Sequence, residues 1–436
     1  MVERFAAPLP QDGAPALETV DRLSQLAVPG LQRSAGSRFF GWVIGGSHPV
    51  GVAADWLTAA WGQNAGNPAC SPAAAACETV AARWLIELLD LPPESSVGFV
   101  TGATMANFVG LAAARGALLE RAGWDLNAHG LFGAPPIQVL IGEEAHATVH
   151  AALQYLGFGQ AQISRIAVDS QGAILPAAFD QALRRAAGPA LVILQAGQIN
   201  TGTFDNFEQL VPLARARGAW IHVDGAFGLW ARSSPLHRRL AAGLEHADSW
   251  AVDGHKWLQV PYDSGYVIVR DSRAHERAMT ISASYLPMAS GERDPSHFVP
   301  ELSRRARGFA TWAMISHLGR KGIEAMVERH VRLAQLLAQT LAREPGITVM
   351  NEVVLNQVIV RFGADSPADQ ADSLTRATIS RVQDNAECYV GGASWRGQWV
   401  MRISVIGFAT DEKEISRTAQ AIASAWSQIR ASTGNG

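Results

Sequence analysis

Between residues 96 and 270 short apolar segments alternate with helical patterns, and this limits the possible folds more than any other feature of the chain. Segments such as "PIQVLIGE", "PALVILQAG" and "AWIHVDGAFG" are separated by stretches with the apolar spacing of helices. Short apolar strands that alternate with helices are typical of a parallel sheet covered by helices. The chain is therefore predicted to be an α/β protein with a mainly parallel sheet.

The segments on either side of this region have a different texture. Residues 1–65 combine Pro- and Gly-rich pieces with two short amphipathic helical patterns, and we predict an N-terminal arm there. Residues 66–310 are predicted to form the large domain, and residues 311–436 a small α+β C-terminal domain with strands near "NQVIVRF" and "WVMRISVI". The aperiodic stretch around residues 281–308 has the length of a functional lid.

Composition excludes several classes of protein. Charged residues make up 17% of the chain, against about 25% in typical soluble proteins, and 48% are hydrophobic, which favours an extensive interior and a buried subunit interface. The net charge of -3 provides no basic field for nucleic acid. We see no apolar run of membrane-spanning length and no secretory signal. The three cysteines predict reduced thiols in the cytoplasm, and their spacing predicts no metal site.

Two motifs suit an anionic, nitrogen-containing ligand. In "VTGATMANF" a helix is expected to begin near Thr104, and backbone N–H groups at a helix start attract phosphate. Asp224 ends an apolar strand, where open α/β sheets place ligand-binding groups, and its carboxylate would suit a protonated pyridine nitrogen. An empty capped helix and a structural Asp paired with Arg or loop amides are the alternatives.

Two further motifs suit an aldehyde-bearing aromatic ring. Lys256 follows His255 directly after an apolar segment, and a buried, neutral lysine amine is what a Schiff-base enzyme requires. His146 follows a strand and begins a helix, and its flat imidazole suits stacking on a planar ring. A surface lysine and a capping histidine are the alternatives. Together, the four motifs match the chemical outline of pyridoxal 5'-phosphate (PLP).

In their order along the chain, these motifs resemble the group II PLP-dependent amino acid decarboxylases, the family of aromatic-amino-acid and glutamate decarboxylases. The resemblance extends from "SRFFGWVIGG" through "TGATMAN", "EEAHATVH", "HVDGAFG" and "DGHKWL" to "MRISVIGFAT". It implies a fold type I, PLP-dependent transferase-like domain, and a homodimer with active sites at the subunit interface and the arm wrapped over the partner.

The resemblance also implies roles for individual residues. Lys256 would form the Schiff base, Asp224 would pair with the pyridinium nitrogen, and His146 would stack on the ring. The remaining cofactor contacts implied are Ala226 against the ring and Gly102, Ala103, Thr104 and His255 around the phosphate. The predicted reaction is decarboxylation of an L-amino acid, with a neutral or aromatic substrate favoured.

Two departures from the family pattern bear on the reaction. Gln195 stands where a threonine often contacts the cofactor, and Pro295 falls at the position of the family's lid tyrosine. We therefore predict His297 or Tyr285 as the proton donor. A decarboxylative aldehyde synthase, a carbon–carbon lyase and a catalytically silent binding paralogue are the alternative functions. Arg402 invites comparison with the carboxylate-binding arginine of related aminotransferases, but structural support is the expectation.

Overall fold

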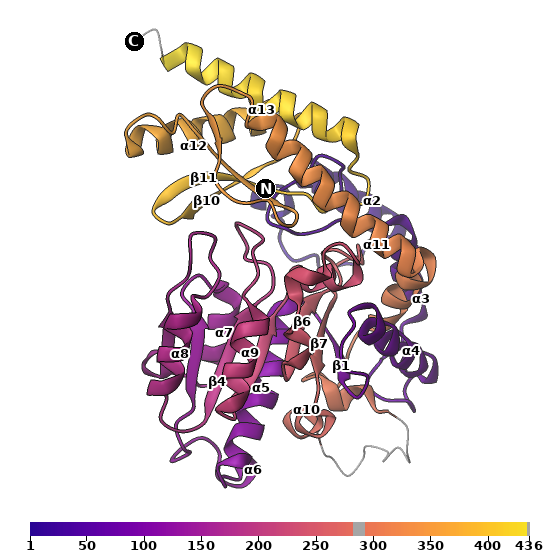
Figure 1. Cartoon of the computed structure of the whole chain (residues 1–436). Coiled ribbons are helices and arrows are strands. Elements are labelled where there is room, and N and C mark those ends of the chain that lie inside the picture. The colour runs from indigo at the N-terminus through magenta and orange to yellow at the C-terminus, as the bar shows by residue number, and fades with distance from the viewer. Residues whose placement is uncertain (282–292, 434–436) are drawn as a thin grey trace.

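The computed structural model describes residues 1–281 and 293–433, and its largest element is a mixed sheet of seven strands in the order β1-β7-β6-β5-β4-β2-β3 (Figure 1). The strands are β1 (Ser96–Val100), β2 (Gln138–Gly142), β3 (Ile163–Ile166), β4 (Ala190–Gln195), β5 (Trp220–Asp224), β6 (Ser249–Asp253) and β7 (Gly265–Val269). Strands β2 to β6 pair in parallel, as the alternating pattern predicts.

Strand β7 runs antiparallel to both of its neighbours, β6 and β1. The reason lies in the connection between β6 and β7, which holds residues 254–264 and no α-helix. A parallel return needs a crossover of a dozen or more residues, usually helical, so this connection brings the chain back in the opposite direction. Lys256 lies within it.

Helices cover both faces of the sheet, and successive strand residues point to opposite sides. Leu140 and Val192 belong to one apolar cluster, while their neighbours Val139 and Leu191 belong to another. The helices are α1 (Val2–Phe5), α2 (Ala16–Ala27), α3 (Pro49–Trp61), α4 (Pro72–Leu88), α5 (Ala103–Arg121), α6 (Leu126–His129), α7 (Ala147–Tyr155), α8 (Pro176–Arg185), α9 (Phe207–Ala216), α10 (Ser272–Met279), α11 (Gly308–Leu341), α12 (Ala368–Asp384) and α13 (Glu412–Thr433).

The C-terminal part contains an antiparallel sheet of four strands in the order β10-β11-β9-β8. The predicted strands are β9 (Gln357–Phe362) and β11 (Gln398–Ser404); β8 (Ile347–Val349) and β10 (Gly391–Trp395) were not predicted. Both are short, and the glycines and polar residues of β10 hide any alternation. The predicted boundary at residue 310 falls in the first turn of α11 and stays a prediction.

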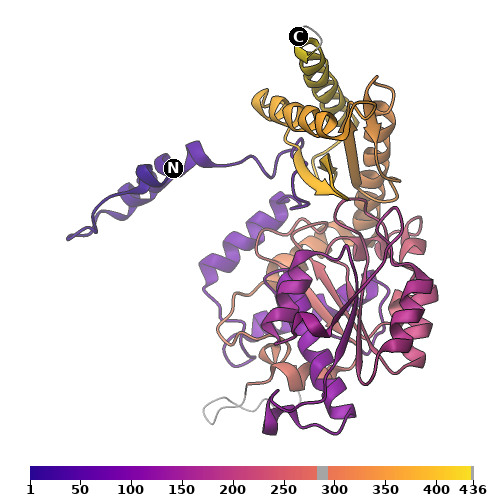
Figure 2. The ribbon, with the colours of Figure 1, turned by 90° about the vertical axis from the view of Figure 1, so that its left-hand side faces the viewer.

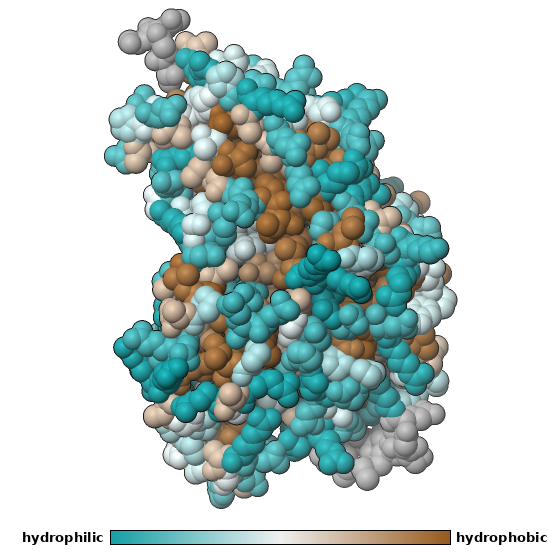
Figure 3. Space-filling view, viewed as in Figure 1, coloured by the Kyte–Doolittle hydropathy of each residue, from teal (hydrophilic) through white to brown (hydrophobic). Residues whose placement is uncertain are grey.

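Apolar packing joins the two sheets at the level of the lysine. Trp257 and Leu258 belong to the same cluster as Val327, Leu355 and Ile406, which lie in or near the C-terminal part. On the face in Figure 3, hydrophobic residues gather between the upper, four-stranded region and the larger region below it. The connection that carries Lys256 is therefore held from both sides by packed side chains.

The N-terminal segment projects away from the rest of the chain (Figure 2). None of the twelve residues of α2 is buried. Among the described residues, no helix combines the length and the apolar character needed to cross a bilayer.

Candidate active site

Lys256 occupies a tight turn directly after β6. Its Nζ lies 2.9 Å from Oδ2 of Asp253 and 5.8 Å from the centre of the Phe227 ring. The turn depends on Gly254, because a Cβ atom there would come within 2.3 Å of the Tyr266 hydroxyl. The Lys256 side chain is 15% exposed, so it is largely but not fully buried.

Asp224 ends β5 and is 6% exposed. Its Oδ1 accepts a hydrogen bond from the Ala226 N–H at 3.3 Å, and no cation of the described chain forms an ion pair with it. Burial raises the pKa of Asp224, and the nearby His146 and Lys256 oppose that rise. A buried carboxylate with one weak donor is costly unless a cation pairs with it.

His146 is the N-cap of α7 and also faces the same cavity as Lys256. Its Nδ1 accepts from the Thr148 N–H at 3.3 Å and lies 2.7 Å from Thr148 Oγ1. Burial is the main cause that lowers its pKa, which favours a neutral imidazole. His146 can therefore cap α7 and line the cavity at the same time.

The first turn of α5 supplies backbone donors. The helix begins at Ala103, one residue before the predicted start, and the Ala103 N–H donates to Oδ1 of Asp253 at 2.6 Å. His255 donates from Nδ1 to the Ser264 carbonyl at 2.8 Å, and burial lowers its pKa. The helix start approaches closely because Gly265 has no side chain: a Cβ there would lie 2.5 Å from Gly102 Cα.

These groups line one cavity of about 310 Å³, within the range of small-molecule sites. It brings together eight of the predicted site residues: Gly102, Ala103, Thr104, His146, Asp224, Ala226, His255 and Lys256. The sheet explains the convergence, since β5 and β6 are neighbours and α5 packs beside both. Carboxyl ends of adjacent parallel strands meet at one edge, where ligands bind.

The residues present fit PLP. The orphaned carboxylate of Asp224 calls for a cationic ring nitrogen, Lys256 offers an amine for the aldehyde, and the start of α5 offers N–H groups for the phosphate. Gln195, noted as a departure from the family pattern, lines the cavity and donates to the Gly197 carbonyl at 3.3 Å.

Sequence reasoning missed several residues of the cavity wall. Asp253 is the most important, because it contacts both Lys256 and Ala103. Its spacing of three residues before the lysine was the available signal. Tyr262 packs its ring 4.4 Å from that of His255 and donates to the Ile44 carbonyl. The other wall residues that were not predicted are Thr148, Gly197, Ile199 and Phe227.

The predicted proton donor His297 does not line this cavity. His297 lies in a short 3-10 helix, η6 (Pro295–Phe298), which packs beside β1 and α10 and lines no part of the cavity. Tyr285 lies outside the described residues. Arg293, which lies in the stretch predicted to be a lid, donates to the Val97 carbonyl and lies 3.7 Å from buried Glu78. A role of His297 at this site requires a second chain or a rearrangement of η6.

A groove of about 480 Å³ adjoins the cavity and shares His146 and Ile199 with it. Arg402 of β11 lines the groove, and burial lowers its pKa. Its side chain makes a long polar contact of 3.5 Å to Asn200 Oδ1, and no carboxylate of the described residues pairs with it. Arg402 therefore has no ion-pair partner among the described residues, and the expectation of structural support stays a prediction.

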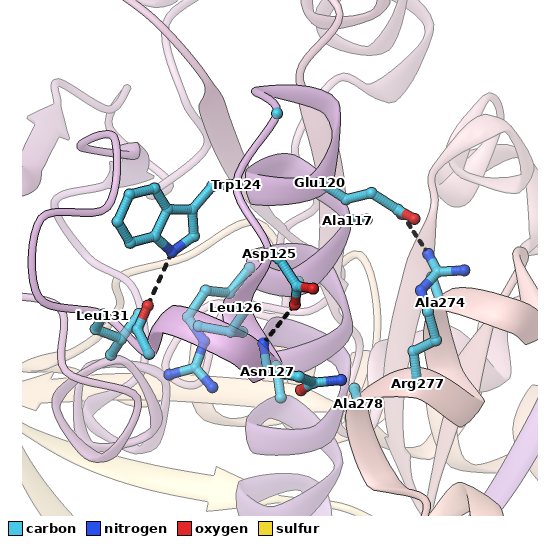
Figure 4. Close-up of a pocket in the computed structure, with 15 residues that line it drawn as sticks. Ala117, Glu120, Trp124, Asp125, Leu126, Asn127, Leu131, Ala274, Arg277 and Ala278 are labelled. Atoms are coloured by element: carbon cyan, nitrogen blue, oxygen red, sulfur yellow. Dashed lines mark hydrogen bonds and ion pairs between the residues drawn. The ribbon is translucent and has the colours of Figure 1, made fainter.

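A larger hollow of about 760 Å³ lies between α5, α6 and α10 (Figure 4). Two pairs of its polar groups satisfy each other: Glu120 pairs with Arg277 at 2.7 Å, and Trp124 donates to the Gly130 carbonyl at 2.8 Å. It holds none of the residues predicted from the motifs. The smaller cavity around Lys256 is therefore the candidate active site.

Comparisons with known proteins agree with this geometry. The family described as "Pyridoxal-dependent decarboxylase conserved domain" matches residues 1–363. The aromatic-L-amino-acid decarboxylase of Bacillus atrophaeus is 26% identical over 424 residues, which cover 93% of this chain and 85% of the relative. The enzyme of the same name from Sus scrofa is 28% identical over 418 residues, 92% and 84% of the two chains.

Solved structures confirm the predicted fold class. Oryza sativa TDC with PLP and tryptamine matches with a TM-score of 0.91 and 23% identity, over 98% of this chain and 91% of the other. Rhodiola rosea 4-hydroxyphenylacetaldehyde synthase matches with a TM-score of 0.87 and 21% identity, over 98% and 91%.

Proposed function

The chain belongs to the pyridoxal-dependent decarboxylase family, and from this premise we propose that it removes the α-carboxylate of a neutral, aromatic L-amino acid to give the amine and CO2. The family makes it a PLP-dependent lyase. The observation that carries the proposal is the convergence of Lys256, Asp224 and His146 on one enclosed cavity.

The chain's own groups have separate tasks in this reaction. When bound, PLP supplies a conjugated ring that accepts the electron pair left as CO2 departs. Lys256 would hold the cofactor through its side-chain amine. Asp224 holds a proton at the ring nitrogen, because its buried carboxylate is stabilised by an adjacent positive charge. His146 contributes a neutral imidazole to the wall.

We propose that Arg402 binds the substrate's α-carboxylate. It is a partly buried guanidinium in the groove that adjoins the cavity, and it lacks a carboxylate partner in the described chain. Arg is suited to paired hydrogen bonds with a carboxylate. A carboxylate held there would lie beside His146, because both residues line the same groove.

The charge of the cavity favours a neutral side chain. Its described lining contains two carboxylates, Asp224 and Asp253, and one lysine that the reaction occupies. An acidic substrate side chain would meet no free cation on this wall, whereas Phe227, Tyr262 and Ile199 offer apolar contact. The names of the relatives, an aromatic-L-amino-acid decarboxylase and a tryptophan decarboxylase, agree with this preference.

We also propose a homodimer in which α2 lies on the partner. Leu17, Val20 and Leu23 follow a helical spacing and are between 58% and 75% exposed. Such an apolar face on an otherwise polar helix marks an interaction surface. A second copy of the chain is the occupant we favour, because the low charge content favours a buried subunit interface.

The test is a product screen of the PLP-loaded enzyme with aromatic, aliphatic and acidic L-amino acids. We expect CO2 and amine in equal amounts from an aromatic substrate, and no activity in Lys256→Ala. Peroxide and ammonia that match the CO2 would establish the aldehyde synthase instead. A silent binding protein would be supported by two results together. No amino acid would give a product, and Lys256→Ala would show the same visible absorbance as the unmodified protein.

His297 remains our proposed proton donor. In His297→Phe we expect amine formation to slow by on the order of 10²-fold or more, with cofactor binding intact. Cofactor absorbance and initial rates of amine release measure the two effects separately. Unchanged turnover in this variant would reject the role.

A further inference from the structure

The buried carboxylate of Asp253 links two parts of the site that the reaction uses separately. One oxygen, Oδ2, lies 2.9 Å from Lys256 Nζ, and the other, Oδ1, accepts from the Ala103 N–H at 2.6 Å. The residue is 2% exposed. The carboxylate therefore joins the catalytic amine to the turn that offers N–H groups for phosphate.

The surroundings of Lys256 make Asp253 its dominant charge contact. Asp224, His146 and His255 are also close enough to Lys256 to interact with it electrostatically, and the Phe227 ring lies 5.8 Å away. Among the described residues only Asp253 forms an ion pair with it. The turn keeps this pair in place, since Gly254 packs against Tyr266 and Ser264 with no room for a side chain.

We propose that Asp253 is the counter-ion of Lys256 whenever the lysine amine is not bonded to the cofactor, and that the same carboxylate fixes the Ala103 amide in the phosphate-binding turn. This counter-ion role rests on the proposed function, because only a Schiff-base lysine becomes a free amine during part of each turnover. Asp253 is then a positioning residue: it returns the released amine to one place beside the cavity.

Two variants separate the two contacts. Asp253→Asn keeps an oxygen that can accept from the Ala103 N–H but removes the charge, whereas Asp253→Ala removes both. Asp248→Asn is the matched control. Asp248 immediately precedes β6, accepts one backbone N–H from Ile221 at 2.8 Å and, among the described residues, pairs with no lysine.

The first readout is competitive acylation of the PLP-free protein at neutral pH, followed by peptide mass spectrometry. The chain has three lysines, and the other two, Lys321 and Lys413, are exposed and serve as internal references. The ion pair with Asp253 holds the Lys256 amine and makes it less available to the acylating reagent. We expect the reactivity of Lys256 relative to the references to rise about tenfold in both Asp253 variants, and to stay unchanged in Asp248→Asn.

The second readout is the ratio of the affinities for PLP and for pyridoxal, which lacks the phosphate. We expect this ratio to be retained in Asp253→Asn and to fall in Asp253→Ala, because only the latter frees the Ala103 amide. Unchanged Lys256 reactivity in a folded Asp253 variant would overturn the counter-ion role. If the ratio of the affinities for PLP and pyridoxal is unchanged in Asp253→Ala, Asp253 does not fix the Ala103 amide in the phosphate-binding turn. Both readouts need no turnover, so they are independent of the product screen.

Discussion

Two carboxylates, one amine and one guanidinium set the charge around the cavity, and each is held by a different element. Asp224 ends β5, Asp253 ends β6, Lys256 follows in the turn, and Arg402 belongs to β11. Placed in water, these charges would interact weakly, but enclosure strengthens every contact among them. The reactivity of each of these residues therefore depends on which opposite charge lies next to it.

The role of Arg402 is tested by removing its charge. In Arg402→Met we expect KM for the amino acid to rise about 10- to 100-fold, because a charged hydrogen bond to the α-carboxylate is worth about 1.5–3 kcal/mol. The inhibition constant of the product amine is the internal control, since the amine has no carboxylate. An equal loss of affinity for the amine would contradict carboxylate binding and indicate a general disturbance of the groove.

Among the elements, the segment that precedes α3 lies unusually close to the turn after β6 that carries Lys256 (the catalytic turn). At Gly45, where φ is +73°, a Cβ atom would lie 2.1 Å from the His255 carbonyl oxygen and 2.5 Å from that of Lys256. Tyr262 reinforces the contact through its hydrogen bond to the Ile44 carbonyl. The arm thus continues into a strap against the backbone that positions Lys256.

This contact predicts a strong effect of a small substitution. Gly45→Ala should lower the thermal midpoint and release PLP more readily, because backbone atoms rather than a flexible side chain must move. Gly62→Ala is the control: its φ is +60° with nothing within 4 Å, so it should cost only about 1–2 kcal/mol of backbone strain. Equal effects in the two variants would show that the strap does not support the turn.

Strand β5 carries a buried histidine that makes the sheet sensitive to acid. His222 contacts Ser249 Oγ and Asn107 Oδ1, both at 2.8 Å, and burial lowers its pKa to about 3. The folded-state pKa is below the unfolded value of 6.5, so the unfolded chain takes up a proton first as the pH falls. The stabilisation by the neutral ring is complete above pH 6.5 and declines by about 1.4 kcal/mol per pH unit below it.

In His222→Gln the thermal midpoint should be lower at pH 7, because the hydrogen bonds between β5, β6 and α5 are weakened. Its further decline from pH 7 to pH 5 should be shallower than in the unmodified chain, because one proton-linked contribution is gone. His129→Gln, at an exposed position in α6, should leave the decline unchanged. Parallel declines in all three proteins would contradict the assignment.

For the whole molecule, one core cluster joins the seven-stranded sheet to the C-terminal part, while α2, in the first part of the arm, projects away from both (Figure 2). The cavity lies between parts of the chain that are distant in sequence, since the first turn of α5, β5 and the turn after β6 all contribute to it. The exposed apolar face of α2 finds no partner in the described chain.

The proposed dimer predicts that this face is needed for assembly. Replacing Leu17, Val20 and Leu23 together with Ser should shift the protein toward monomer in sedimentation equilibrium and lower its activity in parallel. Asp21→Ser with Arg22→Ser, on the same exposed helix, should change neither. A monomeric unmodified protein, or a fully dimeric triple variant, would refute the role of α2.

The sequence by itself determined the α/β class, the mainly parallel character of the large sheet and eight residues of the cavity. These follow from local signals: apolar periodicity, a glycine-containing turn before a helix, and polar residues at strand ends. Only the tertiary structure decided the reversed direction of β7, the contact of Asp253 with Lys256 and Ala103, and the approach of Gly45 to the catalytic turn. The physical reason is that these features depend on distances between segments far apart in the chain, which no local pattern encodes.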